Sequence, residues 1–472
     1  MGIMPYDLTM RDALVSQDFL YTLVLKQPDG QHKPSVIGSI VDYIYAPEQP
    51  QAALEMLAKP SIRIVSLTIT EGGYNIDHTT GEFKLSEPNV AHDLQRQGAQ
   101  PRTVFGLITE ALRLRRERGI PPFTILSCDN IQGNGDVAKR VFVSFATAQD
   151  SAFGAWVSGS VCFPNCMVDR ITPVTTSSDR ESLLEKFGII DAWPVVAEPF
   201  TQWVVEDHFS CGRPNLEALP PWCQISVVPD VMPYELMKLR LLNATHQQMT
   251  YFGYLSGYRY AHEVAQDPVF VKFLLGYMHE EALPTLQPVP GIDLEVYMCT
   301  LIRRYANPEV KDTLARLCAE SSDRIPKWLL PVVREQLAKG GEIRRAAAVV
   351  ASWARYAEAV DEEGQPINVV DRLKTSLVQI ASKNRSHSTC FIENTDVFGE
   401  LAQDKRFVDA YLHVSADRSS TGRLFVEFSH SCPGTAPTAR CWRPQNSAVF
   451  EFRASGRAPG VQADLLRHAR PR

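Results

Sequence analysis

A lysine, an asparagine and a histidine stand at a spacing that could form a catalytic centre. In the run KLRLLNATH they are Lys238, Asn243 and His246, within an otherwise apolar segment. On an ideal α-helix, positions i, i+5 and i+8 lie at about 0°, 140° and 80°, so the three side chains could point towards one ligand. A lysine held against apolar surface loses solvation of its charged form, which lowers its pKa and lets it act as a general base.

Ordinary structural roles fit the same three residues. The lysine could extend along apolar surface with its amine in water, the asparagine could be exposed, and the histidine could be buried with its hydrogen bonds satisfied. The run by itself leaves both interpretations open.

Further polar residues follow two predicted strands. TEGGY (70–74) comes at the end of the strand SIRIVSLTIT (61–70), and Asn130 comes just after the strand PFTILSC (122–128). Two glycines at the carboxyl end of a parallel strand let the backbone approach a ligand closely, and α/β sheets bind their ligands at that edge. Asn130 could donate its amide to a developing oxyanion, or it could cap the next helix.

The elements that must position these residues fall into two regions. Strand-like runs at 35–46, 61–70 and 122–128 alternate with helical patterns at about 49–58, 102–118 and 135–149, which predicts a parallel sheet with crossover helices. From about residue 233 the helical period dominates, at 234–256, 293–306, 308–319, 326–339, 342–360 and 368–382. We therefore expect an α/β domain over 1–232 and an all-helical domain over 233–416. The Arg-, Ser- and Pro-rich tail 417–472 is expected to be disordered.

Composition excludes several classes of partner. The 472-residue chain has a formal net charge of −6 and a pI near 6.0, which gives no support for a nucleic-acid or membrane partner. No apolar run is long enough to span a membrane, and the first residues do not form a signal peptide, so a cytoplasmic location is expected. The ten cysteines are scattered without a zinc-ligand pattern, which predicts free thiols and no metal site.

Several motifs together carry a family resemblance. They are TITEGGY (68–74), PFTILSCDN (122–130), FPNCMVDRITP (163–173), AWPVVAEPFTQWV (192–204), the K-x4-N-x2-H run and PVPGIDL (288–294). In order and spacing they resemble the polyol-specific long-chain dehydrogenases, the mannitol dehydrogenase family, over roughly residues 2–414. The resemblance implies a Rossmann-type domain followed by a helical substrate domain, and zinc-independent interconversion of a secondary alcohol and a ketone with NAD(P).

The resemblance also implies catalytic roles. Lys238 would be the general base, and Asn130 and Asn243 would hydrogen-bond the substrate oxygen as charge develops on it. His246 would orient the substrate and the lysine. Glu235, one turn before Lys238, could serve in proton exchange with solvent.

Substrate contacts are implied at Asp169 and Arg316, which look like ligands for substrate hydroxyls. Arg324 stands where the family often has a lysine; it keeps the positive charge but changes its shape, which leaves its role open.

On the cofactor side, Glu71 would lie near the nicotinamide, beside Gly72 and Gly73. Asp7 could bind the adenosine ribose hydroxyls, which would favour NAD over NADP, or it could cap a helix. The family's glycine-rich fingerprint, of the form GxGxFxRxH, is not found. The chain is therefore expected to lack the first strand, its phosphate-binding turn and the first helix, so its Rossmann-type domain would be truncated with exposed strand edges.

The predicted function is NAD-dependent interconversion of D-mannitol and D-fructose by a monomer. The alternatives are a related polyol or sugar-acid oxidoreductase, such as an arabinitol dehydrogenase or a fructuronate reductase, or a catalytically inactive truncated homologue.

Overall fold

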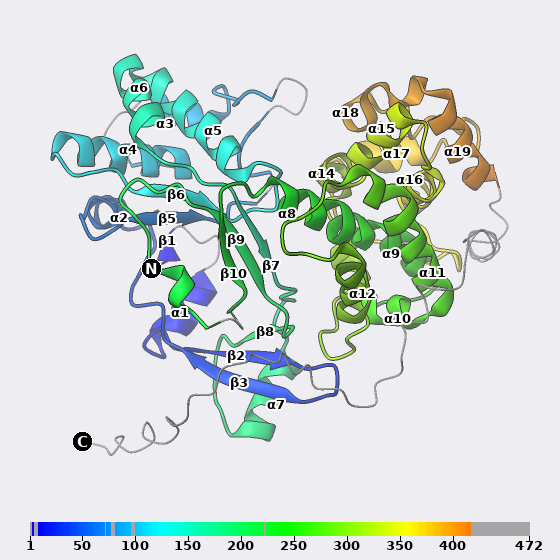
Figure 1. The fold of residues 1–472 in the computed structure, drawn as a ribbon, viewed down its shortest axis with the longest axis horizontal. Helices are drawn as coiled ribbons and strands as arrows, with labels where there is room; N and C mark the ends of the chain where they lie inside the picture. The colour runs from blue at the N-terminus through cyan, green and yellow to red at the C-terminus, as the bar shows by residue number, and fades with distance from the viewer. Residues whose placement is uncertain are drawn as a thin grey trace. The chain divides into compact units, whose positions relative to one another are not determined.

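A computed structural model describes residues 2–3, 8–70, 72–76, 81–95, 100–220 and 223–416. In this part of the chain every strand ends before Pro229, and the segment after it is helical (Figure 1). The predicted order of an α/β region followed by a helical region is therefore confirmed. Glu71, Asp7 and the tail 417–472 lie outside the described residues.

Two parallel strands lie in the core of the first region. They are β5 (Ile64–Leu67) and β6 (Thr124–Ser127), and they are packed with α2 (Pro50–Leu57), α4 (Val104–Glu117), α5 (Asn134–Gln149) and α6 (Ser151–Ser160). The four residues of β6 are all buried, but β5 is only partly buried and exposes Ser66. Within the described residues β6 is the one strand that pairs with β5, so the other edge of β5 carries no strand.

The predicted single strand over 35–46 was wrong. The chain forms β3 (His32–Ile37), an irregular stretch, and then β4 (Tyr43–Ile44), which pairs with β1 (Gly2–Ile3). β3 pairs antiparallel with β2 (Tyr21–Lys26), and β2 pairs on its other side with β8 (Val195–Ala197). The apolar residues that suggested one strand are partly in solvent, since Val36 is 65% and Val41 78% exposed.

A second small sheet has the order β10–β9–β7. It comprises β7 (Cys166–Asp169), β9 (Gln202–Glu206) and β10 (Ile225–Val228). It was not predicted, because these short strands lie in segments with no clear alternation of apolar and polar residues. β7 runs antiparallel to β9 and ends at Asp169, so this sheet positions one of the predicted site residues.

The helical region is built around one interrupted helix. The predicted helix 234–256 consists of α8 (Met232–Met237), the π-helix η3 (Lys238–Asn243) and α9 (Ala244–Leu255). Around it pack α11 (Pro268–Tyr277), α13 (Leu314–Cys318), α14 (Ser321–Trp328) and α16 (Arg344–Tyr356) (Figure 1). The region also contains α10 (Ala261–Gln266), the π-helix η4 (Met278–Ala282), α12 (Leu294–Tyr305), α15 (Leu330–Lys339), α17 (Lys374–Ala381) and α19 (Lys405–Ala416).

The helix predicted over 326–339 is in fact two helices, α14 and α15, because Pro331 starts the second one. Among the described residues, no helix combines the length and the apolar character needed to cross a membrane.

Candidate active site

A π-helix places Lys238 and Asn243 on neighbouring turns. They are the first and last residues of η3, in which backbone hydrogen bonds join residues five apart, as from the Ala244 N–H to the Leu239 carbonyl. Residues five apart therefore lie nearly above one another, and not at the wide angle of an α-helix. The assumption of an ideal α-helix was wrong here. His246 follows three residues after Asn243 on α9, so all three side chains share one side of the chain.

Lys238 is buried at the meeting point of the two regions. Lys238 is 4% exposed, and its Nζ donates a hydrogen bond to Asn130 Oδ1. Asn130 lies just beyond the carboxyl end of β6, as predicted. Because the carbonyl oxygen of Asn130 accepts from the lysine, its amide nitrogen is the atom that can donate to a substrate oxygen.

Two buried polar atoms beside the lysine have no hydrogen-bond partner among the described residues. They are Asn243 Oδ1 and His246 Nε2. A buried polar atom without a partner costs about 1–3 kcal/mol, so a ligand that hydrogen-bonds to these two atoms removes that cost. The pair is well placed for hydroxyl groups.

The imidazole of His246 is held in its neutral form. Burial lowers its pKa well below the ordinary value of 6.5, and the positive charges of Arg316, Arg304, Lys238 and Arg324 lower it further. A neutral imidazole carries one N–H donor and one acceptor, so it can hydrogen-bond a hydroxyl in either direction.

Glu235 reaches from α8 to the amino terminus of α5. Both of its carboxylate oxygens accept from the Gly133 N–H, at 3.0 and 2.9 Å. Burial raises its pKa to about 7, although the Gly133 amide and the charge of Lys238 act in the opposite direction. A carboxylate that titrates near neutral pH one turn from Lys238 suits proton exchange.

Asp169 is held by an arginine that the sequence analysis missed. Arg304 on α12 donates to both oxygens of Asp169, at 2.7 and 2.8 Å, and also to both oxygens of Glu198, at 3.0 and 2.7 Å. No sequence pattern marks Arg304 as a site residue, because it belongs to a helix with an ordinary amphipathic pattern. Glu198 lies within the AWPVVAEPFTQWV motif but carried no predicted role.

The two other predicted cations lie on the histidine side. Arg316 donates to both oxygens of Asp312, at 2.7 and 2.6 Å. Arg324 donates to the carbonyl oxygens of Arg316 and Leu317, at 3.2 and 3.4 Å. Their charges act on His246, as described above, so the structure brings both arginines to the predicted site.

Family models settle the relationship of this chain. The model described as the mannitol dehydrogenase Rossmann domain matches residues 2–218, and the model described as the mannitol dehydrogenase C-terminal domain matches residues 230–415. The chain belongs to the mannitol dehydrogenase family. The predicted resemblance is confirmed, and so is the predicted fold class.

Individual relatives agree with the family models. A mannitol 2-dehydrogenase of Aspergillus fumigatus is 42% identical over 412 residues, which is 86% of this chain and 81% of the relative. A mannitol dehydrogenase of Saccharomyces cerevisiae is 43% identical over 417 residues, which is 87% of this chain and 82% of the relative.

Two solved structures are also similar. The Pseudomonas fluorescens mannitol 2-dehydrogenase ternary complex with NAD and D-mannitol matches with a TM-score of 0.86 and 40% identity. D-sorbitol dehydrogenase in substrate-free form matches with a TM-score of 0.77 and 33% identity. Each comparison covers 91% of this chain and 88% of the other.

Membership of the mannitol dehydrogenase family, with its Rossmann domain, indicates a nicotinamide cofactor. The turn after β5 was predicted to contact it. Asp129 holds this turn by accepting from the amides of Ile69 and Thr70, at 3.2 and 2.8 Å. Gly73 is required, because an added Cβ would lie 2.0 Å from the Ile69 carbonyl oxygen, whereas Gly72 faces open space. The backbone at Gly72 is therefore accessible to a ligand.

No glycine-rich turn among the described residues is free to bind the phosphates of the cofactor. The chain contains a single G-x-G sequence, Gly133-Asn134-Gly135, which follows a strand and opens α5. Its amides are already used: Gly133 donates to Glu235, and Gly135 and Asp136 donate to Asn165 Oδ1, at 2.8 and 3.2 Å. This helix amino terminus is therefore not a phosphate cradle.

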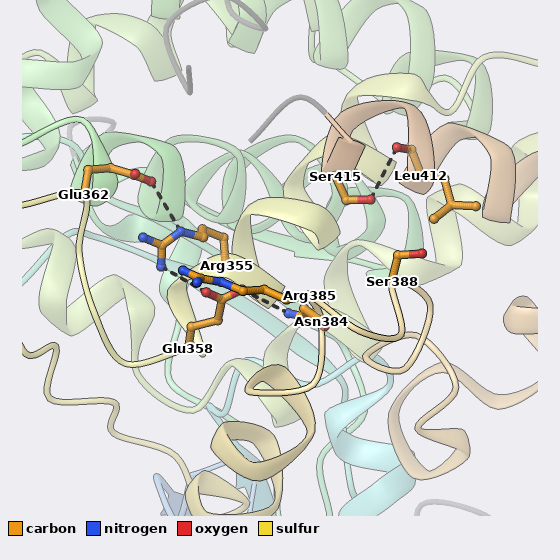
Figure 2. Close-up of a pocket in the computed structure, with 8 residues that line it drawn as sticks. All are labelled: Arg355, Glu358, Glu362, Asn384, Arg385, Ser388, Leu412 and Ser415. Carbon is orange, nitrogen blue, oxygen red and sulfur yellow. Dashed lines mark hydrogen bonds and ion pairs between the residues drawn. The ribbon is translucent and has the colours of Figure 1, made fainter. Parts of the chain in front are cut away.

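A hollow of about 580 Å³ in the helical region lies outside this site. Figure 2 shows its lining residues, Arg355, Glu358, Glu362, Asn384, Arg385, Ser388, Leu412 and Ser415. Arg355 forms ion pairs with Glu358 and Glu362, at 3.5 and 3.4 Å, so these charges neutralise one another. None of the predicted site residues lines the hollow.

Neither a metal site nor a cysteine cluster forms a second candidate site among the described residues. Within the described ranges, no group of three or more His, Cys, Asp or Glu residues could hold a metal ion. Cys299 is disulfide-bonded, so the expectation of free thiols was wrong at this position. In the part of the chain that the structure describes, the free thiols are Cys128, Cys162, Cys166, Cys211, Cys223, Cys318 and Cys390.

Proposed function

We propose that this chain catalyses the NAD-dependent interconversion of D-mannitol and D-fructose, with Lys238 as the general base. The observation that carries the proposal is the buried Lys238–Asn130 hydrogen bond, next to the unpartnered Asn243 Oδ1 and His246 Nε2. The solved Pseudomonas fluorescens relative contains NAD and D-mannitol, which supports this cofactor and this polyol.

During alcohol oxidation, Lys238 takes the proton of the reacting hydroxyl. The amide nitrogens of Asn130 and Asn243 donate to the substrate oxygen as negative charge develops on it, and His246 hydrogen-bonds the same part of the substrate. When bound, the nicotinamide accepts the hydride from the substrate carbon and returns it during ketone reduction.

Glu235 connects the base to solvent. Its carboxylate can receive the proton from Lys238 after oxidation and supply it before reduction, because its pKa lies near 7. Asp169 contacts hydroxyls away from the reacting carbon. The substrate is a small molecule, and we propose that the protein acts on it as a monomer.

Assays of NADH oxidation with D-fructose and with fructuronate test the proposal. We expect turnover with D-fructose and little with fructuronate, because the described Lys238 site offers hydroxyl contacts, and Arg304 and Arg316 already form ion pairs with carboxylates. Preference for fructuronate would favour a sugar-acid reductase.

An inactive homologue is the second candidate, favoured by the occupied amides of the single G-x-G sequence. Quenching of protein fluorescence by NADH distinguishes the two. Binding with turnover supports the enzyme, and no measurable affinity for NADH supports the inactive homologue.

A further inference from the structure

Arg304 forms the most heavily bonded ion cluster of the described site. All three of its guanidinium nitrogens donate, Nη1 to Asp169, Nε to Glu198 and Nη2 to both. The guanidinium also lies over the Phe200 ring, at 3.9 Å from the ring centre. The three charged side chains are almost fully buried, with 5%, 4% and 2% exposure for Arg304, Asp169 and Glu198.

This cluster joins separate parts of the chain. Asp169 ends β7, Glu198 follows β8, and Arg304 comes from the helical region more than a hundred residues later. Glu198 is fixed a second time, because its Oε1 accepts from the Ile171 amide at 2.6 Å. Asp169 is therefore held by a residue of the helical region that is itself fixed by a second carboxylate.

The geometry leaves Asp169 able to bind a ligand. Each of its oxygens accepts one N–H from Arg304, and a carboxylate oxygen can accept two hydrogen bonds. One acceptor position on each oxygen therefore remains, which suits two hydroxyl groups on adjacent carbons of a polyol.

The next residue on α12 acts on the catalytic turn. Tyr305 donates from its hydroxyl to the Leu242 carbonyl of η3, at 3.0 Å, and its ring lies 4.9 Å from the His246 ring. The end of α12 therefore holds the substrate-side carboxylate with one residue and supports the Lys238–Asn243 turn with the next.

We propose that Arg304 is a positioning residue for the polyol: it fixes the Asp169 carboxylate in the orientation that binds hydroxyls remote from the reacting carbon. This inference rests on the proposed function. Arg304 itself touches neither the substrate nor the cofactor, and acts through Asp169.

The test compares Arg304→Ala with the matched variant Arg303→Ala. Arg303 is the neighbouring residue on α12, is exposed, and among the described residues its side chain donates to Thr300 alone. We expect Arg304→Ala to raise KM for D-mannitol and D-fructose by about 30-fold or more, the lower end of the loss that follows truncation of one partner in a buried charge pair, with a smaller change in kcat. Arg303→Ala should leave both constants unchanged, and neither variant should alter NADH affinity.

Chemical rescue separates positioning from a merely structural role. Added guanidinium at millimolar concentration should lower KM of Arg304→Ala towards the wild-type value, because it can occupy the vacated place between the two carboxylates. A folded Arg304→Ala with wild-type KM, or with a raised KM that guanidinium does not lower, would overturn the inference. If Arg304→Ala does not fold, Arg304→Lys replaces it: the single ammonium cannot hold both Asp169 oxygens, so KM should still rise, and an unchanged KM would overturn the inference.

Calorimetric binding of D-mannitol distinguishes this inference from the proposed function. A wild-type chain that binds D-mannitol without turnover would contradict the proposed function, and at least tenfold weaker binding by Arg304→Ala would still support Arg304. Equal affinities of wild type and Arg304→Ala would contradict the role of Arg304 alone.

Discussion

At the scale of single residues, the predicted catalytic site consists of buried polar groups that have few hydrogen-bond partners. Lys238 and Asn130 bond to each other across two regions, while Asn243 and His246 each present a buried atom without a partner among the described residues. Residue types and spacing made these four candidates, because each motif is short and local, and the family resemblance implied their roles. Arg304 and Glu198 escaped prediction, since their contact joins positions 106 residues apart and nothing in either local pattern marks it.

Lys238→Ala should abolish most turnover. Removing a general base typically costs about 10²- to 10⁴-fold in kcat, and the affinity for NADH should change little because the lysine bonds to Asn130. Steady-state kinetics and NADH fluorescence titration measure the two effects. Lys405→Ala is the control, because that side chain is 86% exposed and should leave both values unchanged. Retained turnover in Lys238→Ala would refute the assignment of the base.

Glu235→Gln should change the pH dependence of alcohol oxidation. The pKa of Glu235 is raised to about 7, so its carboxylate is ionised and able to accept a proton only above that pH. Oxidation by the wild type should therefore rise through pH 7, and the variant should lose this inflection. Glu281→Gln is the matched control, because its carboxyl also has a pKa near 7 but caps α16 away from Lys238. An inflection that persists in Glu235→Gln would rule out this carboxylate.

At the scale of secondary-structure elements, the site depends on one irregular turn and on two strand ends. The π-helix could not be predicted, because KLRLLN has the composition of an ordinary α-helix and its extra residue per turn is set by packing. The strand ends were predictable, since β5 and β6 are bounded by glycines and polar residues. β2, β3 and the sheet of β7, β9 and β10 were missed or misplaced because each is short and pairs with distant segments.

Gly73→Ala should disrupt the turn after β5, while Gly72→Ala should leave the stability of the protein unchanged. A Cβ at Gly73 would lie 2.0 Å from the Ile69 carbonyl oxygen, so the backbone must move, whereas a Cβ at Gly72 meets nothing within 4 Å. We expect Gly73→Ala to weaken NADH binding by at least about tenfold and to lower the melting temperature. Equal melting temperatures in the two variants would show that the turn is not held as described.

At the scale of the whole described molecule, polar contacts join the Rossmann-type and helical regions. Besides the cluster around Arg304, His32 Nε2 lies 2.8 Å from Glu309 Oε2, and Asn307 donates to the Lys26 carbonyl at 3.0 Å. Glu235 adds the contact with Gly133. Because such contacts depend on charge and direction, they fix the two halves of the active site in register more than they stabilise the fold. The free energy of unfolding depends more on the buried interiors of the two regions. Its pH dependence comes from buried carboxyl groups in these interiors.

Glu281 should make the protein less stable as pH rises from about 4.5 to 7. It is fully buried, and burial raises its pKa from 4.5 to about 7, although the amides of Ala346 and Arg345 oppose the shift. In that pH window the folded state therefore binds more protons than the unfolded state, so the free energy of unfolding falls as pH rises. A shift of this size corresponds to on the order of 3 kcal/mol.

Urea denaturation at pH 5 and pH 8 measures the effect. The unfolding free energy at pH 5 minus that at pH 8 should be larger in the wild type than in Glu281→Gln, because the glutamine cannot titrate. Any hydrogen bond that the glutamine loses shifts both values equally and leaves their difference intact. Glu263→Gln is the control: this carboxyl also caps a helix, α10, but the amides of Arg259 and Tyr260 lower its pKa. Its contribution is lost only as pH falls below 4.5, so the control should match the wild type between pH 5 and 8. Identical pH dependence in wild type and Glu281→Gln would mean that Glu281 is ionised in the folded protein at pH 5.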